Sequence, residues 1–222
     1  MKLSDDLYYY PWTSFTQNNC NTYVLGAGGQ MMIDPGHRHL FNHVARGMAE
    51  DRLDWRQTKL VVLTHSHPDH FEAVEAFLDS GQTRIALHEA EEEFLELTGR
   101  DFARMMGLAM PSYRVDLHLA EGELEVDGIS LQVFHTPGHS PGHICLYWAE
   151  RKILFSGDLI FDQGVGRTDF PGGDGKLLKD SIQRMAGLDI ELILSGHGDP
   201  VRGRGEVKRN FEFIQQAYFS WL

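Results

Sequence analysis

Short apolar runs bounded by glycine, proline or polar residues recur along this chain. Runs of this kind that are rich in leucine and β-branched residues are typical of strands in a buried sheet. The pattern predicts strands at residues 22–25, 31–34, 60–63, 84–88, 129–135, 144–149, 152–156 and 192–194. The first two are joined by Gly26-Ala27-Gly28-Gly29, a turn-forming sequence that predicts a hairpin at the entry to a sheet.

Amphipathic segments with helical spacing follow several of these strands. They predict helices over residues 39–49, 71–78, 89–97, 176–186 and 206–221. Two successive halves, each with strands and then helices, indicate an α/β fold in which two sheets face each other and helices cover the outside, a four-layer αββα sandwich. At 222 residues the chain is short for two full domains, so we expect one domain over residues 1–222.

Composition and charge narrow the class of partner. Hydrophobic residues make up 42% of the chain and charged residues 23%, as in ordinary globular proteins. The formal net charge of −12 argues against nucleic-acid and anionic-membrane partners. No apolar stretch approaches the ~20 residues of a spanning helix, and the N-terminus lacks the apolar core of a signal peptide, which predicts a cytoplasmic protein. Cys20 and Cys145 lack CxxC spacing and are expected to be reduced, buried thiols.

A dense group of metal-binding side chains directly follows the apolar run 60–63. It reads Thr64-His65-Ser66-His67-Pro68-Asp69-His70. Alternation along an extended segment would place His65 and His67 on one side. Asp69 and His70 open the predicted helix and can point toward the same place. Neutral imidazoles and carboxylates suit zinc, iron or manganese, and their density disfavours the alternative of a capped helix with solvated histidines.

Further candidate ligands stand where three later apolar runs end. The sequence pattern is a strand, small residues and then a ligand, as in Gly138-His139, Gly157-Asp158 and Gly196-His197. A glycine before the ligand lets the backbone turn sharply and approach an ion, so several strand ends can converge on one cleft. Spacing alone does not choose His139 over its neighbours His135 and His143.

The order of these motifs resembles that of the metallo-β-lactamase superfamily, in particular a glyoxalase II-like metallohydrolase in a short form without the C-terminal helical domain. The resemblance covers nearly the whole chain and selects His139 from its neighbours. His135 is then a strand residue, and His143 is a donor behind the ligands or polar filler. The resemblance implies one ion held by His65, His67 and His139, a second held by Asp69, His70 and His197, and Asp158 as the bridge.

The same resemblance implies a function. It points to two divalent metal ions, zinc first with iron or manganese as alternatives, in a hydrolase that acts on a small-molecule substrate with a metal-bridging hydroxide. Asp69 would be the catalytic residue that orients the hydroxide or handles its proton. A thiolate leaves readily without a strong acid, so acyl thioesters, as in a hydroxyacylglutathione hydrolase, are the expected substrates.

Other chemistries share these motifs. A mononuclear Fe(II) persulfide (sulfur) dioxygenase would use His65, His139 and Asp158, with open positions for O₂. A lactonase on the same fold would use the same ligands as the thioesterase. A secreted β-lactamase is disfavoured by the missing signal peptide, and a non-catalytic binding module by the intact set of ligand positions.

Four other parts of the chain carry a signal. Residues 98–118 contain Met105, Met106 and Met110, which suit either an adaptable apolar lid or short helices packed on the core. The group His37, His39 and His43 lacks carboxylate or cysteine company in the sequence and is expected to be solvated. Arg167 and Asp169 are expected to form a structural pair in the loop after Asp158. Basic residues that follow His197 are expected to be solvated rather than bound to substrate: Arg202, Arg204, Lys208 and Arg209.

Overall fold

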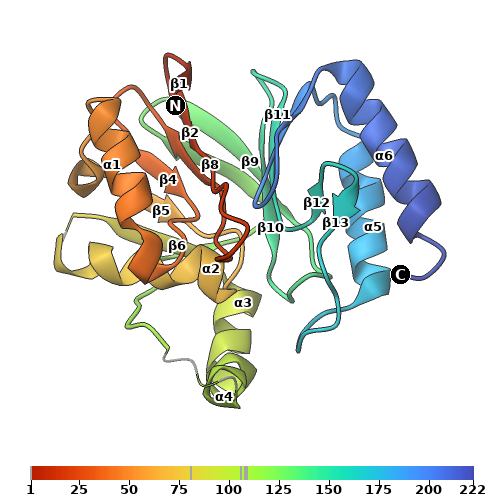
Figure 1. Cartoon of the computed structure of the whole chain (residues 1–222), viewed down its shortest axis with the longest axis horizontal. Coiled ribbons are helices and arrows are strands. Elements are labelled where there is room, and N and C mark those ends of the chain that lie inside the picture. Colours follow the sequence, from red (N-terminus) through yellow and green to blue (C-terminus); the bar gives the residue numbers. More distant parts are fainter. Residues whose placement is uncertain (1, 81, 106, 108–109) are drawn as a thin grey trace.

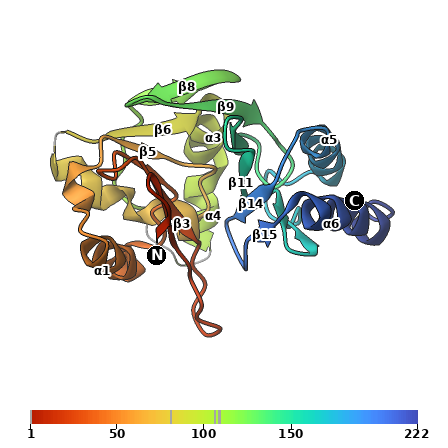
Figure 2. The same ribbon diagram turned by 90° about the horizontal axis from the view of Figure 1, so that it is seen from above.

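Two sheets pack face to face and helices lie outside both of them (Figure 1). The computed structural model describes residues 2–80, 82–105, 107 and 110–222. The view from above shows α1 beyond one sheet and α5 with α6 beyond the other (Figure 2). The four-layer αββα sandwich expected from the sequence is confirmed.

The first sheet has seven strands within the described residues, in the order of the chain. They are β1 (Lys2–Ser4), β2 (Leu7–Tyr10), β3 (Thr22–Leu25), β4 (Met31–Ile33), β5 (Leu60–Val62), β6 (Arg84–His88) and β7 (Leu117–Leu119). Strands β1 to β4 pair antiparallel, and β4 to β7 pair parallel. The parallel strands therefore end at one edge, where the metal-binding motif begins.

The second sheet has six strands in the part of the chain that the structure describes, in the order β15-β14-β11-β10-β9-β8. They are β8 (Gly122–Val126), β9 (Ile129–His135), β10 (Ile144–Trp148), β11 (Ile153–Gly157), β14 (Leu192–Ser195) and β15 (Val201–Arg202). Only β11 and β14 pair parallel, and both end at the edge that faces the motif. A separate small hairpin joins β12 (Ile160–Phe161) to β13 (Gly164–Val165).

Helices cover the outer faces. The α-helices are α1 (Asn42–Glu50), α2 (Pro68–Phe71), α3 (Glu89–Phe94), α4 (Arg100–Met105), α5 (Gly175–Ala186) and α6 (Arg204–Tyr218). Three 3-10 helices (Arg38–Leu40, Trp55–Gln57 and Glu72–Ser80) and a π-helix (Leu95–Gly99) complete the helices of the described residues. None of the described helices is both long and apolar enough to cross a membrane.

The core follows the alternation of side chains along the strands. Val62 and Phe155 point inward and join the cluster between the two sheets, whereas their neighbours Val61 and Leu154 point outward to helices. All four side chains are fully buried. Because both faces of the central strands are covered, these strands are continuously apolar, which is why the apolar runs predicted them.

The sequence predicted most elements of the fold, with three differences. The expected helix over residues 71–78 is a short α-helical turn followed by the 3-10 helix Glu72–Ser80. Seven strands of the described residues were not expected: β1, β2, β7, β8, β12, β13 and β15. Of the methionine-rich segment, Met105 is exposed and Met110 packs against the core, whereas Met106 lies outside the described residues.

Candidate metal centre

The motif that follows β5 forms a loop and not the end of the strand. Strand β5 stops at Val62, so strand alternation does not explain how His65 and His67 come together, and that part of the prediction was wrong. His67 has an extended backbone (φ −62°, ψ 144°) as the residue that precedes α2, and Pro68 is the first residue of that helix. The rings of His65 and His67 nevertheless lie 4.8 Å apart.

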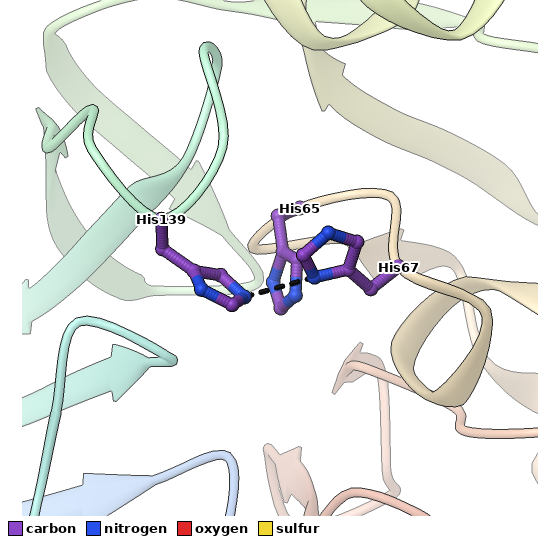
Figure 3. Close-up of side chains that lie close together, drawn as sticks. All are labelled: His65, His67 and His139. Carbon is purple, nitrogen blue, oxygen red and sulfur yellow. Dashed lines mark hydrogen bonds between the residues drawn. The ribbon is translucent and has the colours of Figure 1, made fainter. Parts of the chain in front are cut away.

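Three histidines from two loops form the first group. His67 Nδ1 and His139 Nε2 face each other at 2.8 Å, and the His65 and His139 rings are 4.8 Å apart (Figure 3). One ring nitrogen from each residue lies within 4.8 Å of the other two. His139 comes from the loop between β9 and β10, where Gly138 adopts φ +134° and lies directly against the backbone of Leu178. A side chain at position 138 has no room there.

Asp69, His70 and His197 form the second group. His70 Nε2 lies 3.3 Å from His197 Nε2, and His197 Nε2 lies 3.2 Å from Asp69 Oδ2. Asp69 and His70 stand in α2, whereas His197 follows β14. The sandwich therefore brings together donors that are 127 residues apart in the chain.

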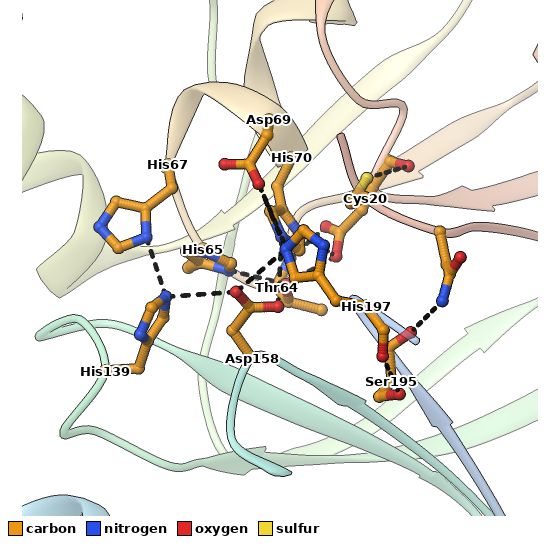
Figure 4. Close-up of polar contacts among 12 residues, drawn as sticks. Cys20, Thr64, His65, His67, Asp69, His70, His139, Asp158, Ser195 and His197 are labelled. Atoms are coloured by element: carbon orange, nitrogen blue, oxygen red, sulfur yellow. Dashed lines mark hydrogen bonds and ion pairs between the residues drawn. The ribbon is translucent and has the colours of Figure 1, made fainter. Parts of the chain in front are cut away.

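Asp158 lies between the two groups (Figure 4). Its Oδ2 is 3.6 Å from His139 Nε2 and 3.4 Å from His197 Nε2, and its Oδ1 is 3.2 Å from His70 Nε2. Gly157, which ends β11, has φ +47° and turns the chain so that the next side chain enters the cluster. The structure thus brings together all seven side chains that the sequence singled out.

His65 Nε2 is buried in this cluster and has no hydrogen-bond partner among the described residues. A buried polar atom left without a partner is costly, so its persistence needs an explanation. A cation between the two groups supplies one, because imidazole nitrogen and carboxylate oxygen are the donors that divalent transition metals bind. The residues present therefore fit a metal centre.

Hydrogen bonds behind the cluster fix which ring nitrogen faces it. His70 Nδ1 donates to Asp34 Oδ2 at 2.9 Å, and His139 Nδ1 donates to the Arg167 carbonyl at 2.8 Å. Thr64 Oγ1 donates to Asp34 Oδ2 and so accepts from His65 Nδ1, at 3.0 Å. In all three histidines the Nε2 atom is thereby left to face the cluster.

Asp34 was not recognised as a site residue from the sequence. Its side chain is buried, and it also accepts from the Thr64 backbone N–H at 2.8 Å. The available signal was its position, since it directly follows β4 in the sequence Asp34-Pro35-Gly36. A carboxylate just after a strand at the motif edge was a candidate partner for a histidine.

The neighbours of His139 behave as the sequence indicated. His135 ends β9 and stacks on His88, with ring centroids 4.2 Å apart, so it is a strand residue. His143 is fully buried, contacts Thr136 Oγ1 through Nδ1 and accepts the Asp158 backbone N–H at Nε2, at 3.1 Å. It therefore holds the turn that carries Asp158.

Burial and charge set the protonation of the cluster. Burial and the neighbouring histidines lower the pKa of His65, and burial together with His139 lowers the pKa of His67 to about 3. Burial alone would raise the pKa of Asp158, but the charges of His70 and His197 hold it well below its usual range. Burial opposes protonation of His197, yet Asp158 and Asp69 raise its pKa to about 9. A metal ion bound here would displace that proton.

A cleft of about 470 Å³ opens beside His197. The loop between β2 and β3, which projects from the sandwich in Figure 2, forms one wall with Trp12 and Phe15. Phe15 is fully exposed at this wall. Asn18, from the same loop, donates from Nδ2 to Asp69 Oδ2 at 2.7 Å. Two residues that line the cleft, Asn18 and His197, therefore contact the predicted catalytic carboxylate of Asp69.

The pair predicted in the loop after Asp158 is confirmed. Arg167 and Asp169 are joined by two hydrogen bonds of 2.7 Å.

The group His37, His39 and His43 was expected to be solvated, and that expectation was wrong for two of its members. His37 is partly buried and contacts Glu72 Oε2 at 2.7 Å, and His43 is partly buried against the Pro11 carbonyl. The sequence did not reveal Glu72 as the partner of His37, because the two residues are 35 positions apart.

Known proteins are similar to this chain in sequence and in fold. The family model of the metallo-β-lactamase superfamily matches residues 15–197. The chain is 33% identical over 215 residues to the hydroxyacylglutathione hydrolase GloC of Haemophilus influenzae, an alignment that covers 92% of this chain and 95% of that protein. It is 34% identical over 187 residues to the probable metallo-hydrolase YqgX of Bacillus subtilis, which covers 80% of this chain and 84% of that one.

A protein of known structure has a similar sequence identity to this chain. TTHA1623, determined in a di-iron-bound form, superposes with a TM-score of 0.71 at 35% identity, over 86% of this chain and 93% of that chain. Its bound iron and the donor groups described above agree in kind, since members of this family bind divalent metals. The family match and the identity to these relatives show that the chain belongs to the metallo-β-lactamase superfamily, as a metallo-hydrolase.

Proposed function

We propose that this protein is a binuclear metal-dependent hydrolase of acyl thioesters. The observation that carries the proposal is the position of Asp158 between two groups of donors, within 3.6 Å of histidines from both. In this proposal His65, His67 and His139 would hold one ion, Asp69, His70 and His197 would hold the other, and Asp158 would be the bridging ligand. Zinc is the first candidate, with iron or manganese as alternatives, because all seven donors are nitrogen or oxygen.

Bound divalent ions supply Lewis acidity, which makes water more acidic and polarises a carbonyl group. The chain itself supplies position and proton transfer. Hydrogen bonds from His197 and Asn18 converge on Asp69, and despite burial the histidines keep the pKa of this carboxyl well below its usual range. An ionised Asp69 beside the cleft can accept a hydrogen bond from the attacking water and so orient it.

The leaving group and the relatives both support acyl thioesters as the proposed substrate class. A thiolate is a weak base and departs without a strong acid, so a site built from metal ligands suffices for a thioester. GloC of Haemophilus influenzae, which aligns over almost its full length, is named for hydrolysis of hydroxyacylglutathione, a thioester. The cleft of about 470 Å³ has room for a small acyl thioester.

One substrate panel tests the proposal. Purified protein is assayed with S-lactoylglutathione, the matched oxygen ester, a lactone, a β-lactam and glutathione persulfide, while thiol release and oxygen uptake are recorded together. We expect the fastest turnover with the thioester, and a loss of about 10²–10⁴-fold in kcat for Asp69→Asn. Asp180→Asn, on the exposed side of α5, is the matched control and should keep wild-type turnover. Oxygen uptake with the persulfide and no thiol release would overturn the proposal in favour of a dioxygenase.

A further inference from the structure

Glu91 is a fully buried carboxylate that accepts four hydrogen bonds. Its Oε1 accepts from the Ser66 backbone N–H at 3.0 Å and from Ser66 Oγ at 2.6 Å. Its Oε2 accepts from Ser140 Oγ at 2.8 Å and from the Gly142 backbone N–H at 2.7 Å. None of these donors is a cationic side chain. Each oxygen is thus satisfied by neutral donors from one segment of chain.

The two segments are the loops that carry the first group of histidines. Ser66 stands between His65 and His67, and Ser140 directly follows His139. The first loop leaves β5 of the first sheet, and the second joins β9 to β10 of the second sheet. Glu91, in α3, therefore ties together two loops that belong to different sheets and that both supply donors to the cluster.

The loop that contains Gly142 packs tightly against Glu91. A Cβ atom at Gly142 would collide with the backbone N and with the Cβ of Glu91, so the second loop lies directly on the start of α3. Hydrogen bonds to an ionised acceptor are shorter and stronger than neutral ones. Four of them on one buried carboxylate hold both loops at fixed positions relative to α3, before any ion is bound.

We propose that Glu91 is a positioning residue that presets the His65, His67 and His139 group for its metal ion. The inference rests on the proposed function only in taking these histidines as metal ligands. Glu91 differs from Asp34 and from the Arg167 carbonyl in what it holds, because those groups orient imidazole rings, whereas Glu91 holds the main chain and the serine hydroxyls beside the ligands.

The variant Glu91→Gln tests the inference while keeping the shape of the side chain. An amide nitrogen replaces one carboxylate oxygen, and whichever side it takes, it faces a backbone N–H that cannot reverse its direction. We expect metal affinity to weaken by about 10–100-fold, the usual effect of removing support behind a ligand. Metal-stripped full-length protein is titrated with Zn²⁺ against a chromophoric chelator. Glu93→Gln is the matched control, since Glu93 is exposed on the same helix and the charge change is identical.

Hydrogen exchange in the metal-free protein gives a second readout that does not involve the loaded enzyme. The amides of Ser66 and Gly142 should lose protection in Glu91→Gln, and amides of β10 should not. If Glu91→Gln is poorly folded, Ser66→Ala and Ser140→Ala each remove one hydroxyl donor and should weaken metal affinity by about fivefold, the value of one hydrogen bond.

A purely structural role predicts a different result. The variants would then unfold more easily but, while folded, would bind Zn²⁺ as tightly as the wild type and keep both amides protected, which would overturn the inference. Failure of the thioester assay leaves this outcome unaffected, because neither metal affinity nor hydrogen exchange depends on the substrate.

Discussion

Asp34 shows how a residue that we do not assign as a ligand can control two that we do. Its carboxylate accepts from His70 Nδ1 directly and reaches His65 through the Thr64 hydroxyl. Both contacts leave Nε2 of the histidine facing the cluster. A single buried carboxylate therefore sets the tautomer of one proposed ligand of each ion.

Replacement of Asp34 by asparagine should weaken metal binding at both positions. The amide nitrogen of asparagine donates hydrogen bonds and cannot accept them. The donor that it faces, on His70 or on Thr64, would therefore lose its acceptor. The backbone at Asp34 has φ +52°, which asparagine tolerates, so the fold should be retained. We expect affinity about 10–100-fold weaker, measured by chelator competition. Unchanged affinity in Asp34→Asn, with Asp180→Asn alongside as the control, would contradict the role given to Asp34.

The sequence revealed the predicted ligands but not the residues that hold them. Histidine and aspartate recur after apolar runs, and this local pattern can be recognised in the sequence alone. Asp34 and Glu91 act through contacts with residues that are 25 to 51 positions away. Their roles depend on which loops the sandwich places side by side. The position of Asp34 directly after β4 was a weak local signal, and a glutamate in an acidic helix has none that separates it from its neighbours.

At the level of elements, glycines at strand ends make room for the cluster. Gly196 directly follows β14, and its φ is not among the positive values that only glycine adopts readily. A Cβ added at this position would collide with Asp158 Oδ1 and lie 2.6 Å from His70 Cε1. Gly196 is therefore required by space and not by backbone conformation.

The variant Gly196→Ala should lose metal without losing the fold. The methyl group displaces the Asp158 carboxylate from the position between the two groups, whereas the backbone can keep its conformation. Metal content by elemental analysis should fall clearly below that of the wild type, with circular dichroism unchanged. Gly205→Ala is the matched control, since position 205 lies in α6, its added Cβ meets only the Arg209 side chain at 3.6 Å or more, and alanine favours a helix. Full metal content in Gly196→Ala would show that the site tolerates a side chain there.

Element prediction succeeded for most central strands and failed mainly at the edges of the sheets. Strands β3, β6 and β9 have the predicted bounds. The missed strands β1, β7, β8 and β15 are edge strands, and β2 lies next to β1. In β8, Leu124 and Val126 are buried whereas Glu123 and Glu125 are exposed, and this short alternation was missed. After α2, the buried side chains of Phe71, Val74 and Phe77 repeat every third residue, which matches the 3-10 helix that forms instead of an α-helix.

At the level of the whole molecule, the cluster joins the two sheets. His65, His67, Asp69 and His70 follow the first sheet, whereas His139, Asp158 and His197 follow strands of the second. Each group contains residues from both sheets, so an ion bound to either group also binds the two halves of the sandwich together. Metal binding and global stability should therefore be coupled.

Removal of metal should lower the melting temperature of the whole protein. Free metal at about 1,000 times its Kd stabilises the folded state by about 4 kcal/mol per site. For a chain of this size, each kcal/mol corresponds to about 2–4 °C, so metal removal should lower the Tm by on the order of 10 °C for each ion removed. Calorimetry of chelator-treated and reloaded protein measures the difference. Asp158→Ala should show a much smaller response to reloading, since Asp158 contacts both groups. The stabilisation should also shrink as the pH falls, because protons compete with metal for the imidazoles. A wild-type protein whose Tm is the same with and without metal would mean that the two halves of the sandwich hold together independently of the site.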